Sequence, residues 1–361
     1  MEITDNFVIE KVGKIIDPNT KKNLAQTKSL KKAVVKEGNI SIEIVLGYPA
    51  RNYIETFKKS IEEDLAKEGI KNPSINISWE IETHSVQKSL KPMQNIKNII
   101  AIASGKGGVG KSTTAINLAL ALANEGANVG ILDADIYGPS QPRMMGLKGQ
   151  PDSEDGKTLQ PMENYGVQAM SIGFLIDEET PMIWRGPMVT QALEQLISDT
   201  NWRNIDYLVV DLPPGTGDVQ LTLAQKIPVS GAVIVTTPQD IALLDARKGL
   251  KMFEKVEVPV LGIVENMSTH ICSKCGHEDT IFGTGGGSAL ADDSSVDLLG
   301  KLPLESSIRE LTDSGKPTVV SDPDGKIAMI YAEIARKTAG ILSAQSKDYS
   351  SKFPKIVIEN N

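Results

Sequence analysis

The chain has 361 residues, of which 40% are hydrophobic, 23% charged and 4% aromatic. This length allows one large domain or two of ordinary size, and the composition excludes the disordered and fibrous classes. The net charge is −8, but residues 1–98 hold 16 Lys and Arg against 13 Asp and Glu, which leaves −11 for residues 99–361. An acidic main body argues against a primary role on nucleic acid, where a basic face supplies most of the affinity.

The sequence also argues against a membrane or export role. Apolar runs such as Gly231–Thr237 are far shorter than the ~20 residues that a bilayer span needs. Residues 1–5 offer neither the basic segment nor the apolar core of an export signal. The only two cysteines, Cys272 and Cys275, form one Cys-x-x-Cys, a spacing typical of metal or redox chemistry. We therefore expect a cytoplasmic protein that uses no membrane.

Residues 1–87 predict a small α/β domain. A helical stretch near Phe7–Ile16 ends at a turn around Pro18, and a second helix is expected over Asn52–Glu68. Alternating apolar and polar residues predict strands over Ser29–Lys36, Asn39–Val45 and Ile75–Ile81. Residues 88–98 contain Pro92 and many polar side chains, so we expect them to form a linker.

Residues 99–345 predict a larger α/β domain, and a polar tail is expected over residues 346–361. Short apolar runs recur here between segments long enough for helices: Ile99–Ala103, Val129–Leu132, Val167–Ile172, Tyr207–Val210, Ala232–Val235 and Val260–Val264. Continuous apolar strands of this kind belong to a parallel sheet that helices cover on both faces.

A phosphate-binding loop follows the first of these strands. The sequence from Gly105 to Ser112 is G-x-x-x-x-G-K-S, and a helix-like segment follows it, which is the context this motif requires. Its glycines let backbone N–H groups turn toward phosphates, and the helix N-terminus adds a favourable dipole. Lys111 is expected to reach the β- and γ-phosphates of ATP, and the Ser112 hydroxyl to bind Mg²⁺.

Carboxylates stand at the ends of two other apolar runs. Asp133 and Asp135 follow Val129–Leu132, and Asp211 follows Tyr207–Val210 in the position of a Walker B aspartate. Carboxylates at strand ends beside a phosphate loop suit the handling of Mg²⁺ and water. We expect Asp211 to hold Mg²⁺ through water, and Asp133 to be structural or to lie in the outer metal shell.

The cysteine pair leaves three interpretations open. A redox pair would place the first cysteine at a helix N-terminus, for which the sequence supplies no helix. A zinc site could recruit His270 and His277, although the spacing His-x-Cys is cramped. An iron–sulfur [4Fe–4S] cluster normally takes four thiolates, so two chains would have to share one cluster.

The second lysine of the phosphate loop, Lys106, makes this loop resemble that of the deviant Walker A ATPases. The chain as a whole resembles the Mrp/ApbC family of iron–sulfur cluster carrier ATPases. The segments that carry this resemblance are GKGGVGKST at 105–113, LDADIYGPSQPRMMG at 132–146, WRGPM at 184–188, DLPPGTGD at 211–218 and the Cys272/Cys275 pair. The implied fold is a P-loop NTPase of the SIMIBI type, with a mostly parallel sheet covered by helices on both faces.

The resemblance implies an ATPase that holds a [4Fe–4S] cluster between two subunits and delivers it from an upstream donor to apo iron–sulfur proteins. Lys106 would reach the partner's nucleotide, Asp135 would align the attacking water, and Asn266 would contact adenine. The expected catalytic residues are Lys106, Lys111, Asp135 and Asp211. The expected ATP-binding residues are Gly105, Lys106, Gly107, Gly108, Val109, Gly110, Lys111, Ser112, Thr113 and Asn266.

The N-terminal domain resembles the small iron–sulfur assembly domain that is often fused to such ATPases, and Asp17-Pro18 fits its pattern. Residues 1–98 contain no cysteine, so docking of a client or partner is the safer expectation for this domain. The main alternative for the whole chain is a nucleotide-switched scaffold ATPase of the partitioning or division-site type with a structural zinc site. A reductase with a dimer-bridging cluster is a further alternative, but such enzymes use widely separated cysteines.

Overall fold

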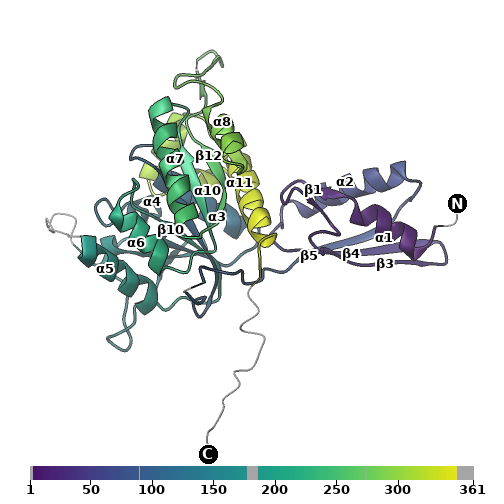
Figure 1. Ribbon diagram of the computed structural model, residues 1–361, viewed down its shortest axis with the longest axis horizontal. Helices are drawn as coiled ribbons and strands as arrows, with labels where there is room; N and C mark the ends of the chain where they lie inside the picture. The colour runs from purple at the N-terminus through teal and green to yellow at the C-terminus, as the bar shows by residue number, and fades with distance from the viewer. Residues whose placement is uncertain (1–2, 89, 177–185, 273, 348–361) are drawn as a thin grey trace, which may run out of the picture.

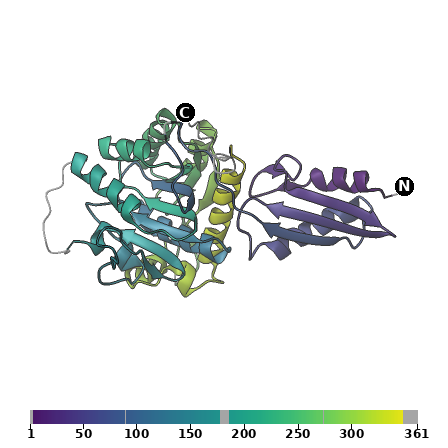
Figure 2. The same ribbon diagram turned by 90° about the horizontal axis from the view of Figure 1, so that it is seen from below.

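The structure, a computed structural model, describes residues 3–88, 90–176, 186–272 and 274–347. Two α/β parts lie side by side, and helix α11 (Lys326–Ser343) runs along the boundary between them (Figures 1 and 2). Of the WRGPM segment, Trp184 and Arg185 lie outside the described residues, as does most of the expected tail, residues 348–361.

The N-terminal part is a three-stranded sheet in the order β3-β4-β5, with two helices on one of its faces (Figure 1). Along β4 every second side chain is buried, because only the face toward the helices is covered. The hairpin between β3 and β4 turns at Glu37 and Gly38, both with positive φ. The elements are α1 (Asp5–Gly13), β1 (Ile16–Asp17), β2 (Lys22–Asn23), β3 (Leu30–Lys36), β4 (Asn39–Leu46), α2 (Ile54–Lys67) and β5 (Ser74–Trp79).

The larger part is built on an eight-stranded sheet in the order β15-β12-β11-β6-β10-β7-β9-β8. Every neighbouring pair is parallel except β8 with β9. Its strands are β6 (Ile96–Ala103), β7 (Val129–Asp133), β8 (Met162–Asn164), β9 (Val167–Ser171), β10 (Ile205–Asp211), β11 (Gly231–Thr236), β12 (Val260–Glu265) and β15 (Leu298–Lys301). All six strands that the apolar runs predict are present. The expected mostly parallel sheet is confirmed.

Helices cover both faces of this sheet, which is why the residues of β7, β10 and β11 are all buried. The helices on one face are α3 (Lys111–Asn124), α4 (Gln141–Met144), α9 (Ser306–Asp313), α10 (Thr318–Ser321) and α11. The helices on the opposite face are α5 (Gly186–Asp199), α6 (Asp218–Lys226), α7 (Asp240–Lys255) and α8 (Gly286–Asp293). A 3₁₀ turn, η1 (Ile172–Phe174), and a small hairpin of β13 (His270–Ile271) and β14 (Glu278–Asp279) complete the elements. No helix among the described residues is long and apolar enough to cross a bilayer.

The segment between the two parts is shorter than the sequence predicts. Strand β6 begins at Ile96, inside the expected linker 88–98, because Ile96 pairs with Ile205 of β10. Residues assigned to the first domain also pack on the second: the His84 backbone N–H donates to Asn98 Oδ1 (3.1 Å). The Gln87 carboxamide donates to the carbonyl oxygens of Ala224 and Ile227 (2.6 and 3.2 Å).

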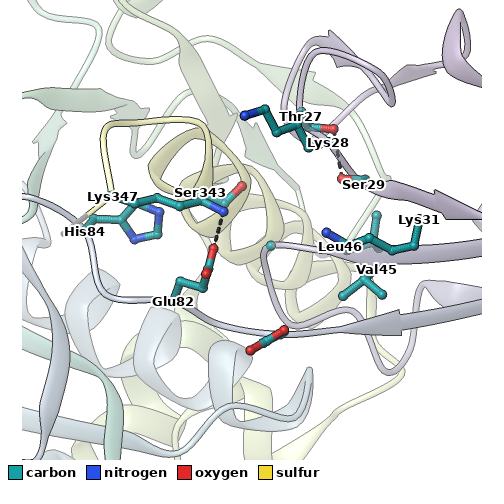
Figure 3. Close-up of a pocket in the computed structure, with 12 residues that line it drawn as sticks. Thr27, Lys28, Ser29, Lys31, Val45, Leu46, Glu82, His84, Ser343 and Lys347 are labelled. Carbon is teal, nitrogen blue, oxygen red and sulfur yellow. Dashed lines mark hydrogen bonds and ion pairs between the residues drawn. The ribbon is translucent and has the colours of Figure 1, made fainter. Parts of the chain in front are cut away.

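A polar cavity of about 110 Å³ lies at the joint between the two parts (Figure 3). The N-terminal sheet supplies one side of it, and the end of α11 and the following residues supply another. Lys347 forms an ion pair with Glu82 at this cavity. The charged side chains that line it are Lys28, Lys31, Lys347, Glu80 and Glu82. The charges nearly balance and the lining is mostly polar, so the cavity is not the apolar pocket typical of ligand sites.

Candidate functional site

The phosphate loop connects β6 to α3 at the centre of the large sheet. Gly108 and Gly110 have φ of +82° and +83°, a conformation that side chains disfavour. A Cβ on Gly107 or Gly108 would meet nothing within 4 Å, so the loop leaves open space in front of its backbone. Gly105, by contrast, lies against the backbone of α7, where a Cβ would come within 2.2 Å of Asp245. The loop is therefore packed from behind and open in front, as a phosphate cradle must be.

Lys111, the first residue of α3, is buried and bonded to two other expected site residues. Its ammonium group forms an ion pair with Asp211 Oδ1 and donates to Ser112 Oγ (3.2 Å). Both partners in the ion pair are almost inaccessible, with side-chain exposures of 6% and 0%. The parallel sheet produces this contact, because β6 and β10 are neighbours and end at the same edge.

Asp133, at the end of β7, holds the chain segment that follows it. Its carboxylate accepts hydrogen bonds from the backbone N–H groups of Asp135 (3.1 Å), Ser140 (2.8 Å) and Gln141 (3.0 Å), and from the hydroxyl of Ser171 (3.2 Å). Burial and the nearby Asp211 carboxylate raise the pKa of Asp133 to about 7. This bonding fits the structural role expected for Asp133.

Asp135 is only partly buried and lies beside the same charged groups. Burial raises the pKa of its carboxyl group, while the positive charge of Lys111 acts in the opposite direction. The structure therefore brings Lys111, Ser112, Asp135 and Asp211 together around the open side of the phosphate loop.

Gln141, the first residue of α4, belongs to this group although the sequence analysis did not select it. Its Nε2 donates to Asp211 Oδ2 (2.9 Å) and to the carbonyl oxygen of Ser112 (3.1 Å). It lies within the segment at 132–146 that carries the family resemblance, but nothing in that segment's spacing assigns it a role. Its place beside Asp211 is seen only in the structure, where residues 133–141 pass over the ends of β7 and β10.

Asn266 and Lys106 also lie at this edge. The Asn266 carboxamide donates to the carbonyl oxygen of Val109 (2.9 Å), and its Nδ2 would lie 2.2 Å from a Cβ on Gly110. It thus braces the phosphate loop, and contact with adenine stays a prediction. Lys106 Nζ lies 3.4 Å from Gln239 Oε1, just before α7, so its side chain contacts a residue of the same chain.

The oxygen donors at this edge fit the nucleotide and metal that the motif implies. The Ser112 hydroxyl and the Asp211 carboxylate are hard oxygen ligands, the kind that Mg²⁺ prefers, beside a cation suited to phosphates. When bound, Mg²⁺ would be held by Ser112 and Asp211 and would partly neutralise the charge of the phosphates.

The cysteine pair lies in the β13–β14 hairpin, apart from the phosphate loop in sequence. The Cys272 N–H donates to the His277 carbonyl (2.8 Å), and the Gly276 N–H donates to the Cys272 carbonyl (2.8 Å). Backbone N–H groups of Lys274 and Cys275 lower the pKa of the Cys272 thiol. Cys275 is exposed, and Cys272 is half-buried. The hairpin thus favours the thiolate of Cys272 and leaves the Cys275 side chain exposed beside it, where a metal centre could reach both.

A zinc site within one chain would need further ligands from the same chain. His270 Nδ1 is directed to the Leu304 carbonyl (3.0 Å), and His277 lies near Asp279 instead. Across the part of the chain that the structure describes, no three His, Cys, Asp or Glu side chains are grouped to hold a metal ion.

Family profiles match nearly the whole chain. A family described as "NUBPL iron-transfer P-loop NTPase" matches residues 95–339, and one described as "Iron-sulfur cluster assembly protein" matches residues 8–74. An "Iron-sulfur cluster carrier protein" of Salmonella typhimurium is 52% identical over 332 residues, which are 91% of this chain and 90% of that protein. The mouse "Iron-sulfur cluster transfer protein NUBPL" is 55% identical over 247 residues, 68% of this chain and 77% of that protein.

Solved structures resemble the larger part. A nucleotide-binding protein from Archaeoglobus fulgidus, solved in complex with ADP, is 38% identical with a TM-score of 0.57, and the match covers 65% of this chain and 91% of that one. The cell division ATPase MinD of Pyrococcus furiosus is 24% identical with a TM-score of 0.51, over 66% of this chain and 97% of that one, a likeness of fold alone.

Proposed function

Because the chain belongs to the family of NUBPL-type iron-transfer P-loop NTPases, we propose that it is an iron–sulfur cluster carrier that binds and hydrolyses ATP. It accepts a [4Fe–4S] cluster from an upstream donor and delivers it to apo iron–sulfur proteins. The observation that carries this proposal is the surface hairpin with Cys272 and Cys275 on the same chain as a fully built phosphate site. A scaffold ATPase of the division-site type would use this hairpin only as a structural zinc site, and the described residues of one chain group no third ligand with the cysteines.

The carrier is a homodimer in this proposal. One chain supplies two thiolates, and a [4Fe–4S] cluster normally takes four, so two hairpins share one cluster. Apolar side chains are exposed near both sites: Ile271 next to Cys272, and Ile241 and Leu244 at the start of α7, which follows the Gln239 contact of Lys106. Ile241 and Leu244 lie one helical turn apart and form one exposed apolar patch, which suits a surface that a partner covers. The second copy of the chain is that partner.

Hydrolysis uses the residues gathered around the phosphate loop. Backbone N–H groups of residues 105–112 and the Lys111 ammonium group bind the phosphates, while Ser112 and Asp211 hold Mg²⁺. Asp135 orients the water that attacks the γ-phosphorus, and the bond to the ADP oxygen breaks as phosphate leaves. Lys106 turns from Gln239 to the nucleotide of the partner subunit. Asn266 contacts adenine while its carboxamide braces Val109.

The N-terminal part serves as a docking module for a client or donor protein in this proposal. It carries no cysteine and so supplies no ligand to the cluster. A cytoplasmic location fits the chemistry, because reducing conditions keep thiols such as Cys272 and Cys275 unpaired.

The first experiment measures iron, acid-labile sulfide and zinc per chain after reconstitution without oxygen. We expect about two iron and two sulfide per chain, since one [4Fe–4S] cluster is shared by two chains. Zinc in stoichiometric amount without sulfide would make the hairpin structural and would overturn the carrier function.

Two single substitutions separate the two sites. Cys272→Ala should abolish cluster binding while ATP binding, measured by titration calorimetry, is retained. Lys111→Ala should do the reverse: it should lose ATP binding and the activation of an apo client enzyme, yet keep the cluster's absorbance. Normal client activation by Lys111→Ala would show that ATP is not coupled to cluster transfer.

A further inference from the structure

Gln141 connects three segments of the nucleotide site through a single side chain and its own backbone. Its backbone N–H donates to Asp133 Oδ2 (3.0 Å), and its Nε2 donates to Asp211 Oδ2 (2.9 Å) and to the Ser112 carbonyl (3.1 Å). The residue is 1% exposed. Gln141 therefore ties the segment after β7 to the end of β10 and to the first turn of α3.

The orientation of its carboxamide follows from these contacts. Both neighbours of Nε2 are acceptors, a carboxylate and a carbonyl, so the amide group must present its N–H groups to them. Its Oε1 then faces away from both, is buried, and has no hydrogen-bond partner among the described residues. Buried polar atoms normally have a partner, which indicates that a further group belongs at this position.

The two oxygens of Asp211 have partners of different kinds. Oδ1 is paired with the ammonium group of Lys111, and Oδ2 accepts from the neutral carboxamide of Gln141. Lys111 must leave this ion pair when it binds the phosphates of a nucleotide. Gln141 has no such second task, so its bond to Oδ2 stays while Oδ1 becomes free.

We propose that Gln141 is a positioning residue for Mg²⁺–nucleotide binding. It fixes the Asp211 carboxylate through Oδ2, so that Oδ1 is presented toward the metal once Lys111 has moved to the phosphates. Its own Oε1 accepts a hydrogen bond from water that enters with the metal. The inference rests on the nucleotide site of the proposed function, and it is independent of what the cysteine hairpin binds.

The alternative is that the Gln141 side chain only fills space at the start of α4 and that its hydrogen bonds do not affect metal binding. An apolar side chain of the same length would fill that space equally well, whereas it would leave Asp211 Oδ2 without its donor. The two roles therefore make different predictions for substitutions that keep the volume and remove the N–H groups.

The test compares ADP affinity with Mg²⁺ and with EDTA, measured by titration calorimetry on the full chain. The gain in affinity that Mg²⁺ gives should fall about tenfold in Gln141→Met, the usual effect of losing one hydrogen bond to a charged group. Affinity for ADP without metal should stay within about twofold, because the group of the phosphate loop to which the Gln141 side chain bonds is the Ser112 carbonyl oxygen, an acceptor that does not bind phosphate. Gln141→Glu keeps the side-chain length and places a second carboxylate beside Asp211, so its loss should be larger.

Gln87→Met is the matched control. Gln87 is also buried, its Nε2 also donates to two acceptors, and its Oε1 also has no partner among the described residues, but it lies far from the site in the segment before β6. This variant should lose stability and keep the full Mg²⁺ effect. Wild-type Mg²⁺ dependence in both Gln141 variants would overturn the proposal. An equal loss of affinity with and without Mg²⁺ would also overturn it, since it would show a general distortion of the loop.

Discussion

At the scale of single residues, the nucleotide site concentrates buried charge. Asp133, Asp211 and Lys111 are all nearly inaccessible, and only one cation stands among the carboxylates of this group. Asp133 is stabilised by three backbone N–H groups, yet its burial still outweighs them and raises its pKa. Because the pKa of Asp133 differs between the folded and the unfolded chain, this carboxyl group makes the free energy of unfolding depend on pH.

The pH dependence has a defined sign. The pKa of Asp133 is about 7 in the folded chain and ordinary, near 3.8, in the unfolded chain. Between these values the folded state binds more protons, so the free energy of unfolding falls as pH rises from about 4 to 7. Asp133→Asn should reduce this fall, as measured by urea unfolding at pH 5 and pH 7.5.

Asp155→Asn is the control, because the pKa of Asp155 is shifted in the opposite direction from that of Asp133. The backbone N–H groups of Thr158 and Lys157 lower the pKa of this exposed carboxyl group. Its substitution should leave the fall in stability between pH 5 and 7.5 unchanged, because this carboxyl group is ionised in both the folded and the unfolded chain over that range. An unchanged slope in Asp133→Asn would contradict the assignment of Asp133 as the titrating group.

At the scale of elements, the phosphate loop depends on the contact between Gly110 and Asn266. Gly110 caps α3 in a left-handed conformation, and the Asn266 carboxamide from the end of β12 fills the space where a side chain would stand. The loop is thus shaped jointly by its own glycines and by a strand far along the chain.

Gly110→Ala should therefore destabilise the protein by at least about 1–2 kcal/mol, the cost of a left-handed non-glycine residue, before the clash with Asn266 is added. Thermal unfolding measures the loss, and ADP binding should weaken in parallel. Gly138→Ala is the control, because a Cβ there meets nothing within 4 Å and its φ is not positive, so stability should change by less than about 0.5 kcal/mol. Equal melting temperatures for the two variants would contradict this account.

At the scale of the whole molecule, the phosphate-loop helix reaches the N-terminal part. Glu125 caps the far end of α3, and its carboxylate pairs with Arg336 of α11 (2.5 Å) and accepts from the Asn52 N–H (3.0 Å). Arg336 also lies over the ring of Tyr53, 4.9 Å from its centroid. A single buried ion pair therefore joins α3, α11 and the segment before α2.

Glu125→Ala should cost about 1–3 kcal/mol, because it removes the acceptor of the Asn52 N–H and the partner of Arg336, whose side chain is 16% exposed and can still reach water. Hydrogen exchange followed by mass spectrometry should show faster exchange around residues 50–57, where the Asn52 N–H loses its acceptor. Lys21→Gln is the control: its ion pair with Asp297 also joins the two parts, but it is exposed and should contribute no more than about 1 kcal/mol. Similar exchange in both variants would show that Glu125 does not hold the joint.

The sequence by itself determined the local features of this protein. The apolar runs predicted six strands, because strands buried on both faces of a sheet are apolar along their whole length, and all six are present. The spacing of the glycines and Lys111 identified the phosphate loop. Fold class and family followed from these features, and the comparisons confirm both. The tertiary structure decided what joins these segments. Strand order brought Asp211 to Lys111, and chain packing placed Gln141, Asn266 and Glu125, because each acts through a partner distant in sequence that no local pattern encodes.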